Sequence, residues 1–273
     1  MSITTESASS AELRASSGLQ IHTVPASRQA TGAFDHGRIT ERKPIGMPHD
    51  RAPQKSVGPL FYWAWAQSQE SGKIGMHPHQ GFEILSYVLE GEMLHRDTLG
   101  SESLVTAGGV QIQQAGSGMS HEEVTGPAKT GFFQIWSQPD LQAALQRPPK
   151  YGEFAHGEFP VSEDAGNSIK TVLGEGSPIS LTTEAEMVDL TLEKASSHER
   201  RLGAGRALIA VTVEGRGQWL ELENGAAELV QARDCTTLIA REDHHVELRN
   251  VGDSTLRTVL IDVPLETGYR LYR

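Results

Sequence analysis

The sequence predicts an all-β protein made of two barrels, and three observations support this. Glycine is abundant, with 28 residues among 273, as turn-rich β proteins require. Short apolar or alternating segments recur at regular spacing between glycine-containing or polar turns, which is typical of sandwiches and barrels. A weak internal repeat relates residues 87–92 (YVLEGE) to residues 211–216 (VTVEGR), 124 positions later. The strand pattern is therefore expected to occur twice.

The first barrel is expected within residues 19–140, after a flexible N-terminal tail at residues 1–18 that is rich in serine, alanine, threonine and glutamate. Such a composition favours disorder. The strands are indicated by bulky residues at alternate positions and by glycines between the segments. They are expected at residues 19–24, 59–67, 82–89, 92–97, 103–106, 110–114 and 131–136, with two further strands that carry the histidines near residues 77–79 and 121–123.

A linker is expected at residues 141–166, which contain one helical turn at 141–145, the proline pair Pro148-Pro149 and an acidic stretch with glycine and proline. The strand rhythm then returns, and residues 167–273 are expected to form the second barrel. Its strands are expected at residues 170–173, 187–192, 207–213, 217–222, 227–230, 236–239, 246–249 and 256–263.

Composition excludes several classes of function. The formal net charge of −11 argues against direct binding to nucleic acid or to an anionic membrane, because both need a basic surface. Cys235 is the single cysteine, so no disulfide can form within the chain, and we expect it to be a small buried apolar residue. No segment has the length of a membrane span or the features of a signal peptide. We expect a cytoplasmic protein, and a monomer.

Residues 77–79 and 121–123 hold the candidate metal ligands. Side chains at i and i+2 of a strand point to the same face. His77 and His79 can therefore direct two imidazoles to one point, and His121 and Glu123 can do the same from a second strand. Three imidazoles and a carboxylate would form a divalent metal site, and an open position on it would permit iron(II) oxygen chemistry.

The same region resembles the pirin branch of the cupin superfamily. The resemblance lies in His-Pro-His-x-Gly-Phe-Glu at residues 77–83, Tyr-Val-Leu-Glu-Gly-Glu at 87–92, His-Arg-Asp at 95–97, and Ala-Gly-Ser-Gly-x-x-His-x-Glu at 115–123. One departure is Gln80, where pirins usually carry arginine. The resemblance implies a two-barrel cupin, or bicupin, built of double-stranded β-helix (jelly-roll) barrels.

The resemblance also implies a function. Pirins of this type have quercetin 2,3-dioxygenase activity. In that reaction a flavonol binds at a divalent metal and loses its hydroxyl proton, and here the metal is expected to be Fe(II). The flavonol then reacts with dioxygen, and the ring opens with release of carbon monoxide. We expect apolar walls from Phe82, Ile84, Ile112 and Phe133 to exclude water from such a site. Pirin-like proteins are also known as regulators, so a redox-sensing metal protein with a regulatory protein partner is the alternative.

The fourth ligand remains a choice between two glutamates. Typical cupins use the glutamate of the first motif, here Glu83, whereas pirins use the carboxylate after the last histidine, here Glu123. Local geometry favours Glu123, because Gly81 can mark a bulge that turns Glu83 away. Glu123 could also leave the metal and act as the catalytic base.

The second barrel is expected to lack metal ligands. With the offset of 124, His77 falls on Arg201 and His79 on Gly203, and neither can replace an imidazole. Glu83 falls likewise on Ala207. His245 lies at the position that matches His121, but a lone imidazole does not make a metal site. The neighbouring His244 is expected to be solvated.

Overall fold

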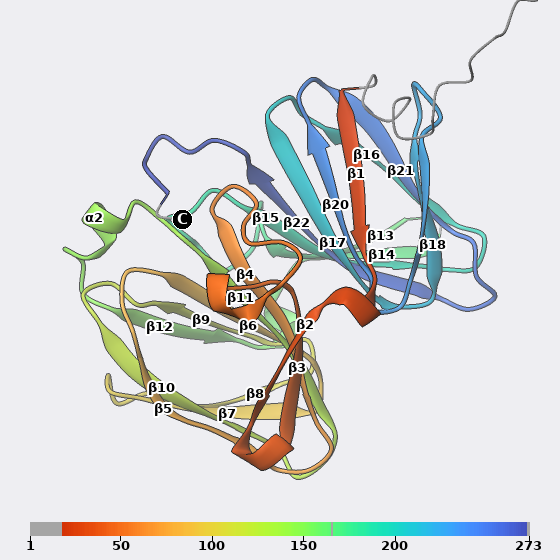
Figure 1. Cartoon of the computed structure of the whole chain (residues 1–273). Coiled ribbons are helices and arrows are strands. Elements are labelled where there is room, and N and C mark those ends of the chain that lie inside the picture. The colour runs from red at the N-terminus through yellow and green to blue at the C-terminus, as the bar shows by residue number, and fades with distance from the viewer. Residues whose placement is uncertain (1–17, 165, 272–273) are drawn as a thin grey trace, which may run out of the picture.

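The computed structural model describes residues 18–164 and 166–271, so residues 1–17 of the expected tail lie outside the described part. The regular secondary structure of the described residues is almost entirely β-strand, and the strands are arranged as two barrels (Figure 1). This confirms the predicted fold class. Its one α-helix among these residues is the short α2 (Leu141–Ala144). No helix in the described ranges has the length and apolar character needed to cross a membrane.

The N-terminal barrel consists of a large and a small sheet, both antiparallel. The large sheet has the order β12-β9-β6-β11-β4-β3-β2, and the small one β5-β10-β7-β8. The strands are β2 (Ala30–Phe34), β3 (Ile39–Ile45), β4 (Leu60–Ser68), β5 (Lys73–His79), β6 (Glu83–Glu90), β7 (Glu92–Asp97), β8 (Glu102–Thr106), β9 (Val110–Gln114), β10 (Met119–Thr125), β11 (Thr130–Ser137) and β12 (Lys150–Phe154).

The C-terminal barrel repeats this plan, with sheets ordered β1-β20-β17-β22-β15-β14-β13 and β16-β21-β18-β19. Its strands are β1 (Leu19–Val24), β13 (Val161–Asp164), β14 (Asn167–Leu173), β15 (Glu186–Leu192), β16 (Ser197–Leu202), β17 (Arg206–Glu214), β18 (Arg216–Glu221), β19 (Ala227–Gln231), β20 (Cys235–Ala240), β21 (His244–Asn250) and β22 (Leu256–Pro264). The single cysteine, Cys235, is buried as expected.

The strand pairings differ from the expected segments at β1, β12 and β13. β13 falls within the expected linker, yet it pairs with β14 of the second barrel. β1 was expected in the first barrel, but it pairs with β20 of the second and lies among the C-terminal strands in Figure 1. β12 falls within the expected linker, yet it pairs with β9 at the edge of the first barrel. The side-chain pattern of a strand does not identify the strand with which it pairs. These pairings could therefore not be inferred from local sequence.

The apolar core lies mainly between the barrels and within the second one. One cluster joins the two large sheets and includes Trp63, Phe133, Met187 and Ile261. Another fills the C-terminal barrel with leucine, valine and one tryptophan. The cluster in the N-terminal barrel is small, because much of that barrel's interior is polar. This polar interior is where the candidate site lies.

A buried polar contact also joins the barrels. The Tyr87 hydroxyl on β6 donates to Asp189 on β15 at 2.5 Å, and Arg257 on β22 donates to the same carboxylate at 2.7 Å. Burial, together with the Asp189 carboxylate, raises the pKa of Tyr87 far above its usual range. The phenol is therefore a permanent donor.

The Tyr87→Phe variant is expected to be less stable by about 1.5–3 kcal/mol, the usual contribution of a hydrogen bond to a charged group. Urea unfolding monitored by tryptophan fluorescence measures this. Tyr269→Phe is a suitable comparison, because its hydroxyl donates to a neutral carbonyl, that of Gln138. An equal loss in both variants would contradict a special role for the contact between the barrels.

Candidate metal centre

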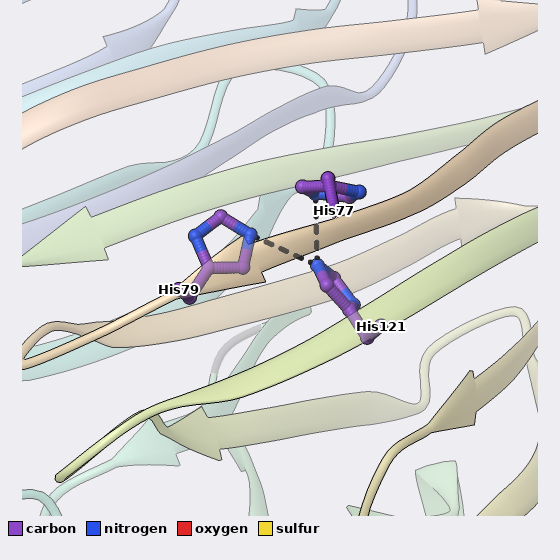
Figure 2. A group of neighbouring side chains, drawn as sticks. All are labelled: His77, His79 and His121. Carbon is purple, nitrogen blue, oxygen red and sulfur yellow. Dashed lines mark hydrogen bonds between the residues drawn. The ribbon is translucent and has the colours of Figure 1, made fainter.

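Two neighbouring strands of the small N-terminal sheet bring three imidazoles together. His77 and His79 are separated by one residue on β5, so they share a face. β10 runs antiparallel to β5 with His121 opposite His77. Figure 2 shows the three rings, two from β5 and one from β10, directed toward a common point. The i, i+2 spacing and the antiparallel register together produce this convergence.

The separations of the ring nitrogens suit a bound ion. His121 Nε2 lies 3.0 Å from His77 Nε2 and 3.0 Å from His79 Nε2. Two nitrogens bound to one ion at about 2.1 Å and at right angles to each other would lie about 3.0 Å apart. A single proton on His121 Nε2 could form a hydrogen bond to His77 Nε2 or to His79 Nε2, but not to both. Three converging nitrogens therefore fit a shared cation.

Contacts on the far side of two rings fix which nitrogen faces this point. The Gly75 carbonyl lies 2.7 Å from His77 Nδ1 and can accept its proton, which leaves Nε2 with a lone pair. The buried Gln113 amide lies 2.9 Å from His121 Nδ1, and its Oε1 has no hydrogen-bond partner among the described residues. Turning this amide over would let Oε1 accept the Nδ1 proton. Such outer contacts orient metal-binding histidines.

Burial keeps the two innermost imidazoles neutral. It lowers the pKa of His79 to about 4, and His77 adds to the effect. The pKa of His121 falls to about 2, first through burial and then through the three neighbouring histidines. Neutral imidazole is the form that binds metal. The pair is therefore ready to act as ligands at neutral pH.

The metal-free protein is expected to lose stability as the pH falls below about 6.5, the ordinary pKa of histidine. The unfolded chain takes up protons there, whereas folded His79 and His121 do not until about pH 4 and about pH 2. Glu123 has the opposite effect on stability, because burial raises its folded pKa to about 7 and the folded state takes up that proton first. The two histidines together outweigh this single carboxylate. Urea unfolding of metal-stripped protein at about pH 7 and about pH 5 tests this, and a stability that rises toward pH 5 would contradict it.

Glu123 lies on β10 two residues after His121 and is buried. Its carboxylate accepts hydrogen bonds from Gln134, whose Nε2 lies 2.9 Å from Glu123 Oε1 and 2.8 Å from Oε2. Gln111 Nε2 lies 2.6 Å from Oε1 and Ser86 Oγ 3.2 Å from the same atom. The group of converging metal-ligand atoms contains the three imidazoles and not this carboxylate.

Glu83 is engaged elsewhere. Its carboxylate accepts from the backbone N–H groups of Thr182 and Thr183, at 2.6 and 2.9 Å, and from Gln114 Nε2 at 2.7 Å. Those threonines belong to the loop that enters β15 of the second barrel. Glu83 therefore links the two barrels. Its oxygens accept hydrogen bonds from donors that lie outside the group of three imidazoles.

A cavity of about 600 Å³ adjoins one of the three imidazoles, that of His77. It reaches both His77 and Glu123, and its apolar wall comes from Phe34, Ala66, Ile74, Phe132 and Trp136. The expected wall was wrong: Ile112 and Phe133 belong to the core between the barrels, while Phe82 and Ile84 are not among the lining residues. Neighbouring residues on β11 face opposite sides, so Phe132 takes the place that Phe133 was expected to fill.

Sequence reasoning missed the polar residues behind the site. Ser86, Gln111, Gln113, Gln134 and His95 are all buried. The alternation of Gln111 and Gln113 on β9 was the available signal, because two glutamines two residues apart share a face. This signal is weak, because glutamine is mostly a surface residue.

The second barrel has apolar or basic side chains at the equivalent positions. Val246 pairs with Arg200 and Glu221, as His121 pairs with His77 and Asp97 in the first barrel. Arg200 thus stands for His77 and Val246 for His121. By the same register Leu202 stands for His79 and Leu248 for Glu123. The uniform offset of 124 placed these matches one residue away, because the two barrels differ in the lengths of their turns.

Comparison with known proteins agrees with this architecture. The family model described as Pirin matches residues 50–137. A Pseudomonas aeruginosa protein with the provisional name quercetin 2,3-dioxygenase is 30% identical over 228 residues, which cover 81% of this chain and 96% of the relative. A pirin-like protein of Caulobacter vibrioides is 27% identical, with coverages of 80% and 94%.

Solved structures share the fold. The Escherichia coli pirin YhhW in complex with nickel(II) superposes with a TM-score of 0.74 at 24% identity, covering 90% of this chain and 99% of the other. A quercetin 2,3-dioxygenase from Acinetobacter baumannii gives a TM-score of 0.74 at 23% identity, with coverages of 93% and 82%.

Proposed function

Because the chain belongs to the pirin family of two-barrel cupins, we propose that it is a metal-dependent dioxygenase that cleaves flavonol-like substrates, in the manner of quercetin 2,3-dioxygenase. Its metal would be Fe(II), held by His77, His79 and His121. A divalent ion there would act as a Lewis acid toward a substrate oxygen and support reaction with dioxygen.

The observation that carries this proposal is the cavity beside His77. Its volume of about 600 Å³ falls in the range of small-molecule sites, which are usually apolar with a few polar groups. A site that only sensed redox state would need no such space. Phe132 and Trp136 provide flat walls for an aromatic ring, and Ile74 adds an aliphatic surface that helps exclude water.

Glu123 has the properties of the base that removes the flavonol hydroxyl proton. It lines the same cavity as His77, and burial raises its pKa to about 7, against the opposing hydrogen bonds from Ser86, Gln134 and Gln111. A base is most effective when its pKa lies near the working pH. Service as a fourth ligand is the alternative role, and it would require the carboxylate to leave its amide partners.

The test is metal analysis of the purified protein, followed by anaerobic iron loading and oxygen uptake with quercetin. The proposal expects oxygen consumption, release of carbon monoxide and loss of flavonol absorbance, all of them absent from metal-stripped protein. Tight iron binding without turnover of any flavonol would refute the enzymatic role and favour the alternative, a regulatory metal protein.

A further inference from the structure

A second group of metal-ligand atoms lies at one end of the C-terminal barrel. Glu221 ends β18, Glu223 follows in the next turn, and His244 begins β21. One ligand atom from each residue lies within 4.8 Å of the others. The expectation that His244 is solvated was wrong, since the residue is 3% exposed and Glu221 is 1% exposed.

Two buried atoms of this group lack partners. His244 Nδ1 lies 2.8 Å from Glu221 Oε1, which also accepts from Asn224 Nδ2 at 3.0 Å. Glu221 Oε2 and His244 Nε2 have no hydrogen-bond partner among the described residues. A buried carboxylate oxygen and a buried imidazole nitrogen without partners are costly. The unpartnered carboxylate oxygen belongs to the side chain that contacts His244 Nδ1, so a cation bound at this group would give Glu221 Oε2 a partner.

The charges of the group also favour a cation. Glu221 and Glu223 together contribute two negative charges. Within residues 18–164 and 166–271, their recorded ion-pair contacts are to imidazoles, His244 for the first and His245 for the second, and none involves lysine or arginine. A divalent ion would balance both carboxylates without protonation of either histidine.

We propose that Glu221, Glu223 and His244 form a second divalent-cation site. One nitrogen and two carboxylate donors suit a first-row transition ion such as Zn²⁺, with water completing its coordination on the exposed side of Glu223. The ion would tie the turn after β18 to the start of β21. This site differs from the position equivalent to the first centre, where Val246 stands, and does not depend on the proposed dioxygenase activity.

Zinc titration of the full-length chain by calorimetry tests the proposal. Metal-stripped wild-type protein is expected to bind two equivalents, and His121→Ala, which disables the first centre, one equivalent. Adding Glu221→Gln to His121→Ala should weaken the remaining equivalent at least about 10-fold, the lower end of what a changed ligand environment costs. Glu214→Gln in the same background is the matched control, because Glu214 is an exposed strand-end glutamate outside the group, and should leave it unchanged.

Glu223→Ala in the same background guards against misfolding of the Glu221 variant, since Glu223 is exposed and its removal leaves the barrel interior intact. It too should weaken the remaining equivalent. Absence of any micromolar zinc binding by His121→Ala would overturn the proposal. So would a remaining equivalent that survives both Glu221→Gln and Glu223→Ala.

Discussion

His121→Ala is expected to lose at least about 100-fold in affinity for the catalytic metal and to lose flavonol turnover. His121 Nε2 is the atom that approaches both other imidazoles, at 3.0 Å each. Changes in residues that merely support a ligand cost about 10–100-fold, so loss of the central ligand should cost at least the upper end. Competition with a coloured chelator measures the affinity.

His22→Ala is the control for a general effect of losing a histidine, because His22 is exposed on β1. It should bind metal as the wild type does. If His121→Ala kept wild-type iron affinity, the assignment of the three imidazoles as ligands would be wrong, whatever its activity.

Glu123→Gln and Glu83→Ala are expected to fail in different ways. Glutamine at 123 keeps the side-chain shape but cannot take up a proton, so turnover should fall by about 10²–10⁴-fold with metal content and stability largely retained. Glu83→Ala should keep the metal. Because it leaves the buried N–H group of Thr183 without its acceptor, it should lose about 1–3 kcal/mol of stability. The part-buried N–H group of Thr182 also loses its acceptor, but water can replace it there.

Iron content, turnover and urea stability, measured on both variants and on Glu123→Ala, separate the roles. Loss of iron in Glu123→Ala together with Glu123→Gln would identify Glu123 as the fourth ligand and not the base. Loss of iron in Glu83→Ala would reverse the assignment of the two glutamates. Full turnover in Glu123→Ala would remove Glu123 from the mechanism.

The parts of the site that depend on local spacing could be predicted from the sequence. His77 and His79 share a strand face because side chains alternate, and His121 was expected to meet them from a second strand. The fold class followed in the same way from short, regularly spaced strands. These features repeat along the chain or lie within a few residues of one another, so a single sequence contains them.

Features that depend on pairing between distant segments could not be predicted. The partner of Glu83 is a backbone segment 99 residues away, and no property of that loop marks it as a carboxylate-binding segment. Phe132 lies in the cavity wall where Phe133 was expected, because neighbouring residues of β11 face opposite sides and the sequence of β11 alone does not tell which side faces the cavity. A shift of one residue reverses every side chain of a strand.

The exchange of β1 has a consequence for how this chain folds during synthesis. Thr23 on β1 contacts Thr236 on β20, 213 positions later, so the first strand leaves the ribosome long before its partner is made. Throughout that interval the edge of β1 is open to wrong pairing. Contacts so distant along the chain also slow folding. A nascent chain halted after the first barrel would carry an unmatched strand, and chaperone capture is most valuable at that stage.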